Sequence, residues 1–203
     1  MKLVFPSLRY KENAVQFINE FYEYNSEING SGGLDRYLRE STYEEWLKKV
    51  LADIDIANVQ QSRVPALTYF YIREEDDKIL GMINIRLAGN EFIKREGGHI
   101  GYCIRPTERR KHYATDMLND ALKVFDTLCI KEVVLTCYKS NIASVNVIKN
   151  CKGELVEEFY SDIYKKELQR GDYARVWTRR VLNEAPEGCL QKDTQDIQLN
   201  KFQ

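Results

Sequence analysis

The chain has 203 residues, which suits one domain, or one domain with a modest appendage. Hydrophobic residues make up 43% of it and charged residues 30%, a composition that can bury a core. The 30 Lys and Arg residues nearly balance the 31 Asp and Glu residues, giving a formal net charge of −1. Nucleic-acid binders gather a basic excess because phosphate contacts supply most of their affinity. The charge balance therefore argues against a nucleic-acid partner.

Other classes are disfavoured by patterning. The chain has no uninterrupted apolar run of about 18 residues or more, so we expect no membrane-spanning segment. The N-terminus breaks at Pro6 and lacks the apolar core and cleavage site of a signal peptide. The five cysteines show no C-x-x-C pair, and only two histidines are present to complete a metal site. We therefore predict a cytoplasmic protein with reduced thiols and no metal centre.

Two amphipathic helices are predicted in the N-terminal part of the chain. Apolar residues recur at helical spacing near residues 10–25 and again over 43–52, where Ser41 or Thr42 is a suitable cap. The Gly- and Ser-rich stretch between them predicts a loop. Strands over 67–72 and 79–87 follow, joined by an acidic hairpin turn, and a third strand covers 98–104.

The second half begins with the most regular helix, at about 112–128, in which every expected apolar position is filled. A nearly all-apolar run predicts a buried strand over 133–138. A helix over 141–150 and strands over 153–160 and 173–181 complete the pattern. We assign residues 1–183 to one α/β (α+β) domain and residues 184–203 to a polar tail or loosely attached segment.

The turn between the third strand and the long helix carries the chemistry. Arg109, Arg110 and Lys111 precede the N-terminus of that helix, where the first amide N–H groups are unpaired and the helix dipole is positive. Successive N–H groups in such a turn can form a nest for an anion. The sequence therefore predicts a pyrophosphate site. A solvated basic turn that only connects strand to helix is the alternative.

This turn resembles the pyrophosphate motif of the GNAT N-acetyltransferase superfamily. That motif is Gln or Arg, two residues, Gly, one residue, and Gly or Ala. Arg109 matches its first position and Ala114 its last, whereas His112 replaces the usual first glycine. Glycine allows the backbone to approach phosphate closely, so a side chain there is a departure. We interpret His112 as pointing outward, and the alternative is that its protonated ring donates to phosphate.

A second segment resembles the family's stretch after the fifth strand, which is Asn, then Ala or Ser three residues later, then Tyr four residues further. Asn141 and Ser144 match it. Asn141 also suits the N-cap of its helix, which is compatible with the functional interpretation. Ile148 stands where many members have a tyrosine that protonates the departing thiolate, so that role is not carried over.

The resemblance covers residues 3 to 181 and includes features of a bacterial subset of the family. It implies a single GNAT-like domain with a central mixed, mainly antiparallel sheet, flanked by helices and splayed between the fourth and fifth strands. It further implies acetyl-CoA (CoA) as the cofactor. The residues it implies for cofactor binding are Tyr102, Cys103, Ile104, Arg109, Arg110, Lys111, His112, Tyr113, Ala114, Thr115, Asn141 and Ser144.

The implied reaction is direct attack of a primary amine on the thioester in a ternary complex. A group must accept the amine's proton, and we predict Glu96, acting through a water, or His99. A surface acid and a half-buried, hydrogen-bonded strand residue are the structural alternatives. CoA's thiolate leaves tolerably by itself, and Tyr138 or Tyr102 would help as an acid.

The acceptor is expected to be a small-molecule or peptide amine. We predict that it contacts Ser31, Gly32, Asp35, Asn84 and Arg86. A strand arginine is costly to bury unpaired, so Arg86 either reaches solvent or meets an anion. That anion is a carboxylate on the acceptor or, as the structural alternative, the carboxylate of Asp35 or a nearby Glu.

Two rival functions are kept. One is a non-catalytic acetyl-CoA-binding or regulatory module, favoured by His112 and Ile148. The other treats the basic turn as a contact patch for a protein or RNA. Exposed final strands are compatible with a homodimer.

Overall fold

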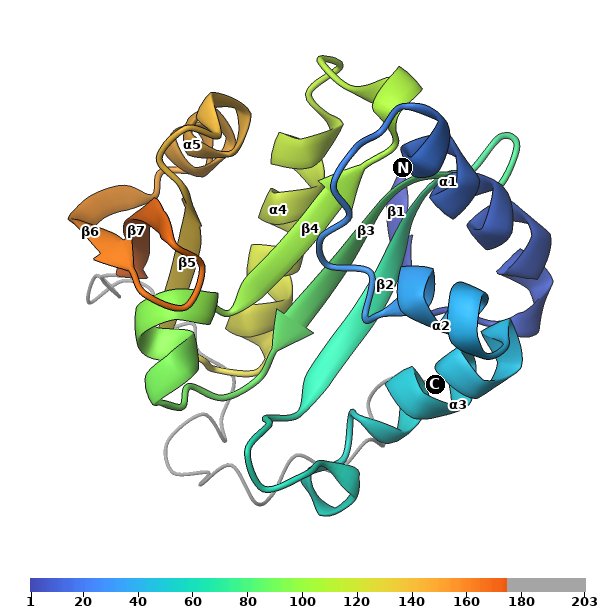
Figure 1. Cartoon of the computed structure of the whole chain (residues 1–203), viewed down its shortest axis with the longest axis horizontal. Helices are drawn as coiled ribbons and strands as arrows, with labels where there is room; N and C mark the ends of the chain where they lie inside the picture. The colour runs from blue at the N-terminus through green and yellow to red at the C-terminus, as the bar shows by residue number, and fades with distance from the viewer. Residues whose placement is uncertain (175–203) are drawn as a thin grey trace.

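The computed structural model of the chain describes residues 1–174 (Figure 1). Its strands are β1 (Lys2–Val4), β2 (Ala66–Arg73), β3 (Lys78–Arg86), β4 (Ile100–Ile104), β5 (Glu132–Tyr138), β6 (Glu154–Ser161) and β7 (Lys166–Ala174). Its α-helices are α1 (Lys11–Glu23), α2 (Leu34–Glu40), α3 (Tyr43–Ala52), α4 (Tyr113–Thr127) and α5 (Ile142–Asn150). A π-helix covers Ile93–Gly97, and 3-10 turns cover Leu8–Tyr10, Ile56–Asn58 and Pro106–Glu108.

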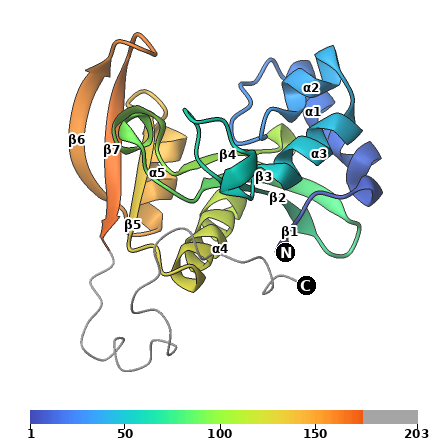
Figure 2. The same cartoon turned by 90° about the horizontal axis from the view of Figure 1, so that it is seen from below.

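The strands form two antiparallel sheets, one in the order β1-β2-β3-β4 and one in the order β5-β7-β6. β4 and β5 are therefore both edge strands, and they face each other. They meet where the amide of His99 donates to the carbonyl of Val134 over 2.7 Å, and then diverge (Figures 1 and 2). The predicted splay between the fourth and fifth strands is confirmed.

The four-stranded sheet is covered on both faces. Helices α1 to α3 pack on one face, where Phe70 and Met82 join Trp46 in a buried cluster. Helix α4 packs on the other face, where Ile83 and Ile85 meet its own apolar side. Because both faces are covered, every residue of β2 and β3 is buried or half-buried, and most of them are apolar. The edge strand β4 therefore belongs to a sheet that is packed on both faces.

The loop between α1 and α2 lies directly on β4. Gly30 has a φ of +68° and lies so close to the carbonyl of Gly101 that a Cβ there would overlap it. Only glycine combines this backbone conformation with such an approach. The paired glycines thus place residues 29–33 against the middle of β4.

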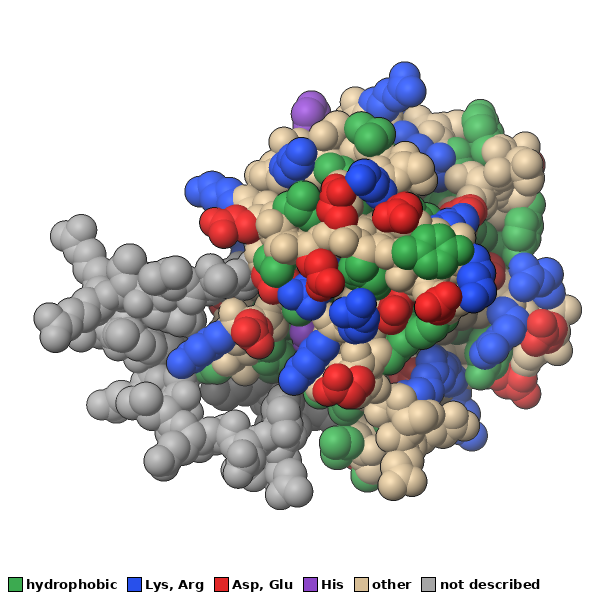
Figure 3. All heavy atoms as spheres, turned by 60° about the vertical axis from the view of Figure 1, so that its left-hand side comes forward, with side chains coloured by type: hydrophobic (Ala, Val, Ile, Leu, Met, Phe, Trp, Pro, Cys, Tyr) green, Lys and Arg blue, Asp and Glu red, His purple; other side chains and the backbone are tan. Residues whose placement is uncertain are grey.

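The surface is mixed in charge. Figure 3 shows acidic and basic side chains interspersed on the face that includes the left-hand side of Figure 1. Within residues 1–174, no helix is long and apolar enough to cross a membrane. Among the described residues, Cys103, Cys137 and Cys151 are free thiols, as predicted.

Most predicted elements are confirmed within a residue or two, and Thr42 caps α3 by accepting from the Glu45 amide over 3.2 Å. The last strand was placed wrongly, because β7 begins at Lys166 rather than at residue 173. Its first residues are mostly polar, so they lack the apolar signal used to find strands. β1, α2 and the π-helix were missed. Residues 175–183 of the predicted strand and domain, and the predicted tail at 184–203, lie outside the described residues.

Candidate active site

The turn before α4 is a ready-made anion site. The amides of residues 110–114 donate no hydrogen bond within residues 1–174, whereas the Thr115 amide already bonds the His112 carbonyl. Arg110 and His112 have φ values of 62° and 64°, the left-handed conformation that turns successive N–H groups toward a common point. The turn lies at the end of the molecule where β4 and β5 have diverged (Figure 1).

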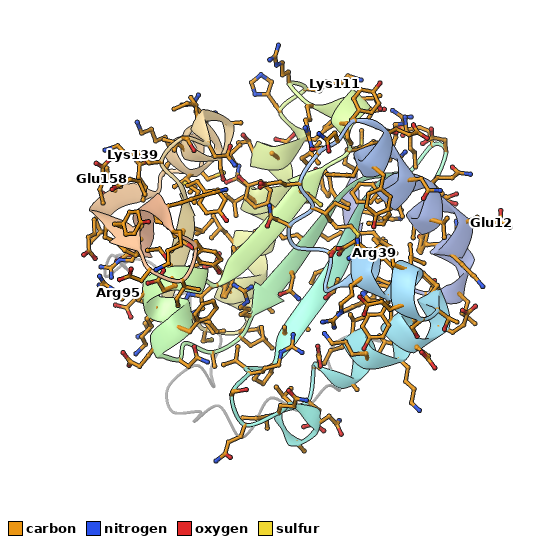
Figure 4. All side chains as sticks on the ribbon, viewed as in Figure 1. Glu12, Arg39, Arg95, Lys111, Lys139 and Glu158 are labelled. Carbon is orange, nitrogen blue, oxygen red and sulfur yellow. The ribbon has the colours of Figure 1, made fainter. Side chains whose placement is uncertain are left out.

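Some side chains of this turn form bonds to neighbouring residues, and others form none with the described residues. Arg109 donates to the carbonyl of Ile104 over 3.1 Å and to Ser26 Oγ over 2.7 Å. Lys111, which projects at the rim in Figure 4, pairs with Glu108 at 2.8 Å. Arg110 forms no ion pair with any described residue, and His112 is exposed, in agreement with the outward orientation predicted for it. Arg110 is therefore the free full charge beside the amides.

Half-buried residues of the first turn of α4 complete this region, namely Tyr113, Ala114 and Thr115.

The space between the diverging strands is bridged by two side chains. The Tyr102 hydroxyl on β4 lies 3.0 Å from Ser144 Oγ on α5. Burial raises the pKa of Tyr102 to about 12, so this phenol is neutral. Asn141 accepts from the Ser144 amide over 3.1 Å and caps α5, which confirms the N-cap predicted from the sequence. Tyr102, Asn141 and Ser144 are thus brought together across the opening.

Two other predicted cofactor residues lie differently. Cys103 is buried on the α1–α3 side of β4, so only its backbone is available at the free edge. The carbonyl of Ile104 already accepts from Arg109. Ile148 is buried in the core, which agrees with the loss of the family tyrosine's role at that position.

A cavity of about 410 Å³ opens on the α1–α3 side of the sheet. Four of the residues predicted to contact the acceptor line it, namely Ser31, Gly32, Asn84 and Arg86. Residues that sequence reasoning missed line it too, among them Lys49, Asp53, Val59, Arg63, Asn90 and Phe92. Such residues come from loops and a helix face with no shared spacing, so no sequence signal connects them.

The predicted acceptor residue Asp35 is not among the lining residues. Its carboxylate accepts from Ser31 Oγ over 2.8 Å and lies 3.9 Å from Arg39. The structural alternative for Arg86, an ion pair with Asp35 or a nearby Glu, is wrong, because Arg86 forms no ion pair with any residue of 1–174.

The cavity lies next to the junction of the two sheets. The amide of Arg86 donates to the carbonyl of His99 over 2.8 Å, and the His99 amide donates to Val134. Asn84 pairs in register with Gly101 of β4. The cavity is therefore one strand away from the point where β4 and β5 part.

The two predicted bases differ in their surroundings. His99 is only 5% exposed, and its Nδ1 accepts from the Val134 amide over 3.0 Å. Burial lowers its pKa, and its ring packs edge-on against Phe125. These contacts match the structural alternative, since they join the two sheets. Glu96 has one carboxylate oxygen, Oε2, that is shielded from solvent and has no partner within residues 1–174.

Glu96 belongs to a small cluster beside β5. Its carbonyl accepts from Thr136 Oγ1 over 2.8 Å, which fixes the π-helix against that strand. The rings of Tyr138 and Tyr164 lie 6.0 Å apart, edge to face. Burial raises the pKa of Tyr164 and the negative charge of Glu96 raises it further, whereas Arg86 opposes them. Tyr164 was missed because it lies in the turn of the misplaced hairpin.

No group of three or more His, Cys, Asp or Glu residues in the described chain is arranged to hold a metal ion.

The sequence model of the acetyltransferase (GNAT) domain matches residues 18–154. The chain belongs to this family. It is therefore an acetyltransferase, with acetyl-CoA as the donor of the acetyl group. A search of curated protein sequences finds no significant match.

Solved structures share the fold at low sequence identity. The microcin C7 self-immunity acetyltransferase MccE, in complex with acetyl-CoA and AMP, is 18% identical with a TM-score of 0.57, over 85% of this chain and 91% of that one. The ribosomal-protein-S5-alanine acetyltransferase from Vibrio fischeri is 15% identical with a TM-score of 0.60, over 87% and 93%. A point mutant of spermidine N-acetyltransferase SpeG from Vibrio cholerae is 15% identical with a TM-score of 0.55, over 86% and 95%.

Within the GNAT family this chain has two departures whose structural setting is now clear. His112 takes the left-handed conformation that a glycine would adopt without strain. Ile148 is a core residue, so any acid must come from elsewhere.

Proposed function

We propose that this GNAT protein transfers an acetyl group from acetyl-CoA to a primary amine by direct attack in a ternary complex. The observation that supports it best is the run of unpaired amides at residues 110–114, beside the diverging edges of β4 and β5. A donor site at the turn and an acceptor cavity near the sheet junction would bring two substrates to one point.

The donor side would be bound mainly by backbone. The amides of residues 110–114 and the charge of Arg110 suit the pyrophosphate, and the free edge of β4 near Tyr102 suits the amide groups of pantetheine. For that arm to pass between the strands, the Tyr102–Ser144 hydrogen bond would open or shift.

The reaction then needs few groups. The amine nitrogen attacks the carbonyl carbon, the C–S bond breaks, and CoA leaves as a thiolate whose pKa resembles the ordinary value of about 8.5 for a free thiol. We assign the amine's proton to Glu96, through a water, because its Oε2 is buried without a partner. Tyr138 and its neighbour Tyr164 are the candidate acids for the thiolate.

Thermal unfolding with acetyl-CoA, CoA and a plain nucleotide tests the donor site. A rise of several degrees specific to the two CoA compounds is expected, because a ligand that binds only the native state stabilises it. Release of free thiol from acetyl-CoA with a library of amines then tests turnover. If the CoA compounds do not raise the melting temperature specifically, the proposal that the turn binds pyrophosphate is refuted.

One observation favours a second function. Since Ile148 removes the family's tyrosine acid, a non-catalytic acetyl-CoA-binding module would show the same thermal shift and no thiol release with any amine. The interspersed acidic and basic side chains in Figure 3 do not favour the alternative in which the basic turn is a contact patch for a protein or RNA.

The proposal also includes a cytoplasmic location and a homodimer. The mass of the protein in solution tests the homodimer.

A further inference from the structure

The acceptor cavity carries an unusual charge pattern. Four charged residues line it, and two of them, Lys49 and Asp53, neutralise each other at 2.5 Å. The other two, Arg63 and Arg86, form no ion pair with any residue of 1–174. Two positive charges therefore remain at the wall of one cavity. Charges of one sign that share a low-dielectric wall repel each other, and Arg63 does lower the pKa of Arg86, after the larger effect of burial.

Arg86 is held as a fixed binding group. Its Nη1 donates to the carbonyls of Gly97 and Gly98, each over 2.6 Å. No described hydrogen bond uses its other guanidinium nitrogens. A guanidinium positioned in this way presents its remaining N–H groups in a rigid fork that matches a carboxylate or phosphate. Arg63, by contrast, is exposed at the cavity mouth.

The remainder of the wall suits a small polar molecule. Asn84 and Ser31 contribute polar side chains, and the volume of about 410 Å³ lies in the range of small-molecule sites. A polyamine would place further positive charge against two unpaired arginines, which costs free energy.

We propose that the acceptor is a small amine that carries an anionic group, a carboxylate or a phosphate, bound by Arg63 and Arg86. This inference rests on the proposed function, because the cavity is taken to be the acceptor site of the acetyl transfer. The anion would lie at the arginines and direct the amine toward the junction of β4 and β5, one strand away.

The test measures binding to the CoA-loaded protein by calorimetry, since CoA allows no reaction. The probes are ethanolamine, β-alanine, O-phosphoethanolamine and spermidine, which share a primary amine and differ in charge. At least one anionic amine is expected to bind about tenfold or more tightly than ethanolamine and spermidine. β-Alanine and O-phosphoethanolamine separate a carboxylate from a phosphate.

Variants locate the effect. Arg63→Gln, at an exposed loop position, is expected to abolish most of the preference for anionic amines. Arg86→Lys is expected to weaken this preference, because lysine keeps the charge but lacks the forked N–H groups of the guanidinium. Arg9→Gln is the matched control, because Arg9 pairs with Asp77 in the β2–β3 hairpin, at the other end of these strands from Arg86. Equal affinity for all four amines, no binding of either anionic amine at millimolar concentration, or a preference unchanged in Arg63→Gln and Arg86→Lys would overturn the inference. Loss of CoA binding itself would instead refute the donor site, so the two failures are distinguishable.

Discussion

The proposed donor turn and the proposed acceptor cavity offer different kinds of binding group. At the turn, the binding groups are backbone amides of residues 110–114, and the side chains mostly brace the loop. At the cavity, the groups that we propose to face the acceptor are side chains, above all Arg63, Arg86 and Asn84. A backbone site tolerates sequence change as long as the chain keeps its shape, whereas a side-chain site changes its ligand when one residue changes. The turn therefore carries the family's motif, and under our proposal the cavity decides what this member acetylates.

The largest expected effect separates catalysis from donor binding. Glu96→Gln removes the proposed proton acceptor and keeps the size of the side chain, so kcat should fall by about 10² to 10⁴-fold. Acetyl-CoA should still raise the melting temperature as much as in the unmodified protein. Thiol release measured across pH checks this, because loss of the base also flattens the acidic limb of the profile.

Glu91→Gln is the control for this substitution, because Glu91 is exposed two residues before the π-helix. An unchanged kcat in Glu96→Gln would remove Glu96 from the mechanism and leave the transfer itself intact.

The wall of the cavity offers a matched pair of glycines. Gly30 and Gly33 both have positive φ, at +68° and +87°, but a Cβ on Gly30 would overlap the Gly101 carbonyl, whereas one on Gly33 meets only Tyr37 at 4.0 Å. Gly30→Ala should therefore cost about 3 kcal/mol or more of unfolding free energy, and Gly33→Ala about 1 kcal/mol. Denaturant unfolding measures both. Equal costs would mean that the loop does not need its close approach to β4.

The same contrast explains what the sequence could predict. The fold could be predicted because α4 shows an unbroken apolar period and because the basic turn keeps the family's spacing from Arg109 to Ala114. The splay followed from that resemblance rather than from any local pattern. Four of the five predicted acceptor residues line the cavity, since they lie on the predicted loop and on the predicted strand over 79–87.

The rest needed three-dimensional placement. Arg63 is one exposed arginine in a polar loop, and only the cavity shows that it stands near Arg86. Tyr164 reaches the Glu96 cluster because β7 starts at Lys166, in a strand whose first residues are mostly polar. The buried environment of His99 also follows from pairing between two sheets, which no single segment encodes.

A smaller effect tests how the donor turn is anchored. Burial raises the pKa of Glu108, but hydrogen bonds from Lys111 and Lys78 outweigh it and lower the value from 4.5 to about 2. A carboxyl with a depressed pKa stabilises the fold above its unfolded pKa, and this contribution is lost as pH falls through the folded value. Between pH 4.5 and about 2 the protein should therefore lose stability, by about 3 kcal/mol at most from this group.

Glu108→Gln should be less stable at neutral pH and show a shallower loss in acid. Glu12→Gln, at an exposed position of α1 (Figure 4), should leave the acid dependence unchanged. Identical slopes for Glu108→Gln and the unmodified protein, measured by denaturant unfolding at several pH values, would count against the anchoring role.

The smallest expected effect tests whether CoA binding at the turn depends on its backbone conformation or on its charge. His112→Gly restores the family residue at a left-handed position and should stabilise the fold by about 1 kcal/mol, with CoA bound at least as tightly. Arg110→Gly relieves the same conformation, at a φ of 62°. It also deletes the one basic side chain of residues 109–111 that makes neither a hydrogen bond nor an ion pair with a described residue. That variant should also gain stability, yet bind CoA several-fold more weakly, and more so at low salt. Unfolding free energies and CoA affinities of the two variants together decide the matter. If both bind CoA equally well, the amides alone hold the pyrophosphate; if His112→Gly weakens binding, the imidazole itself contacts the cofactor, and the departure from glycine is an adaptation of this chain.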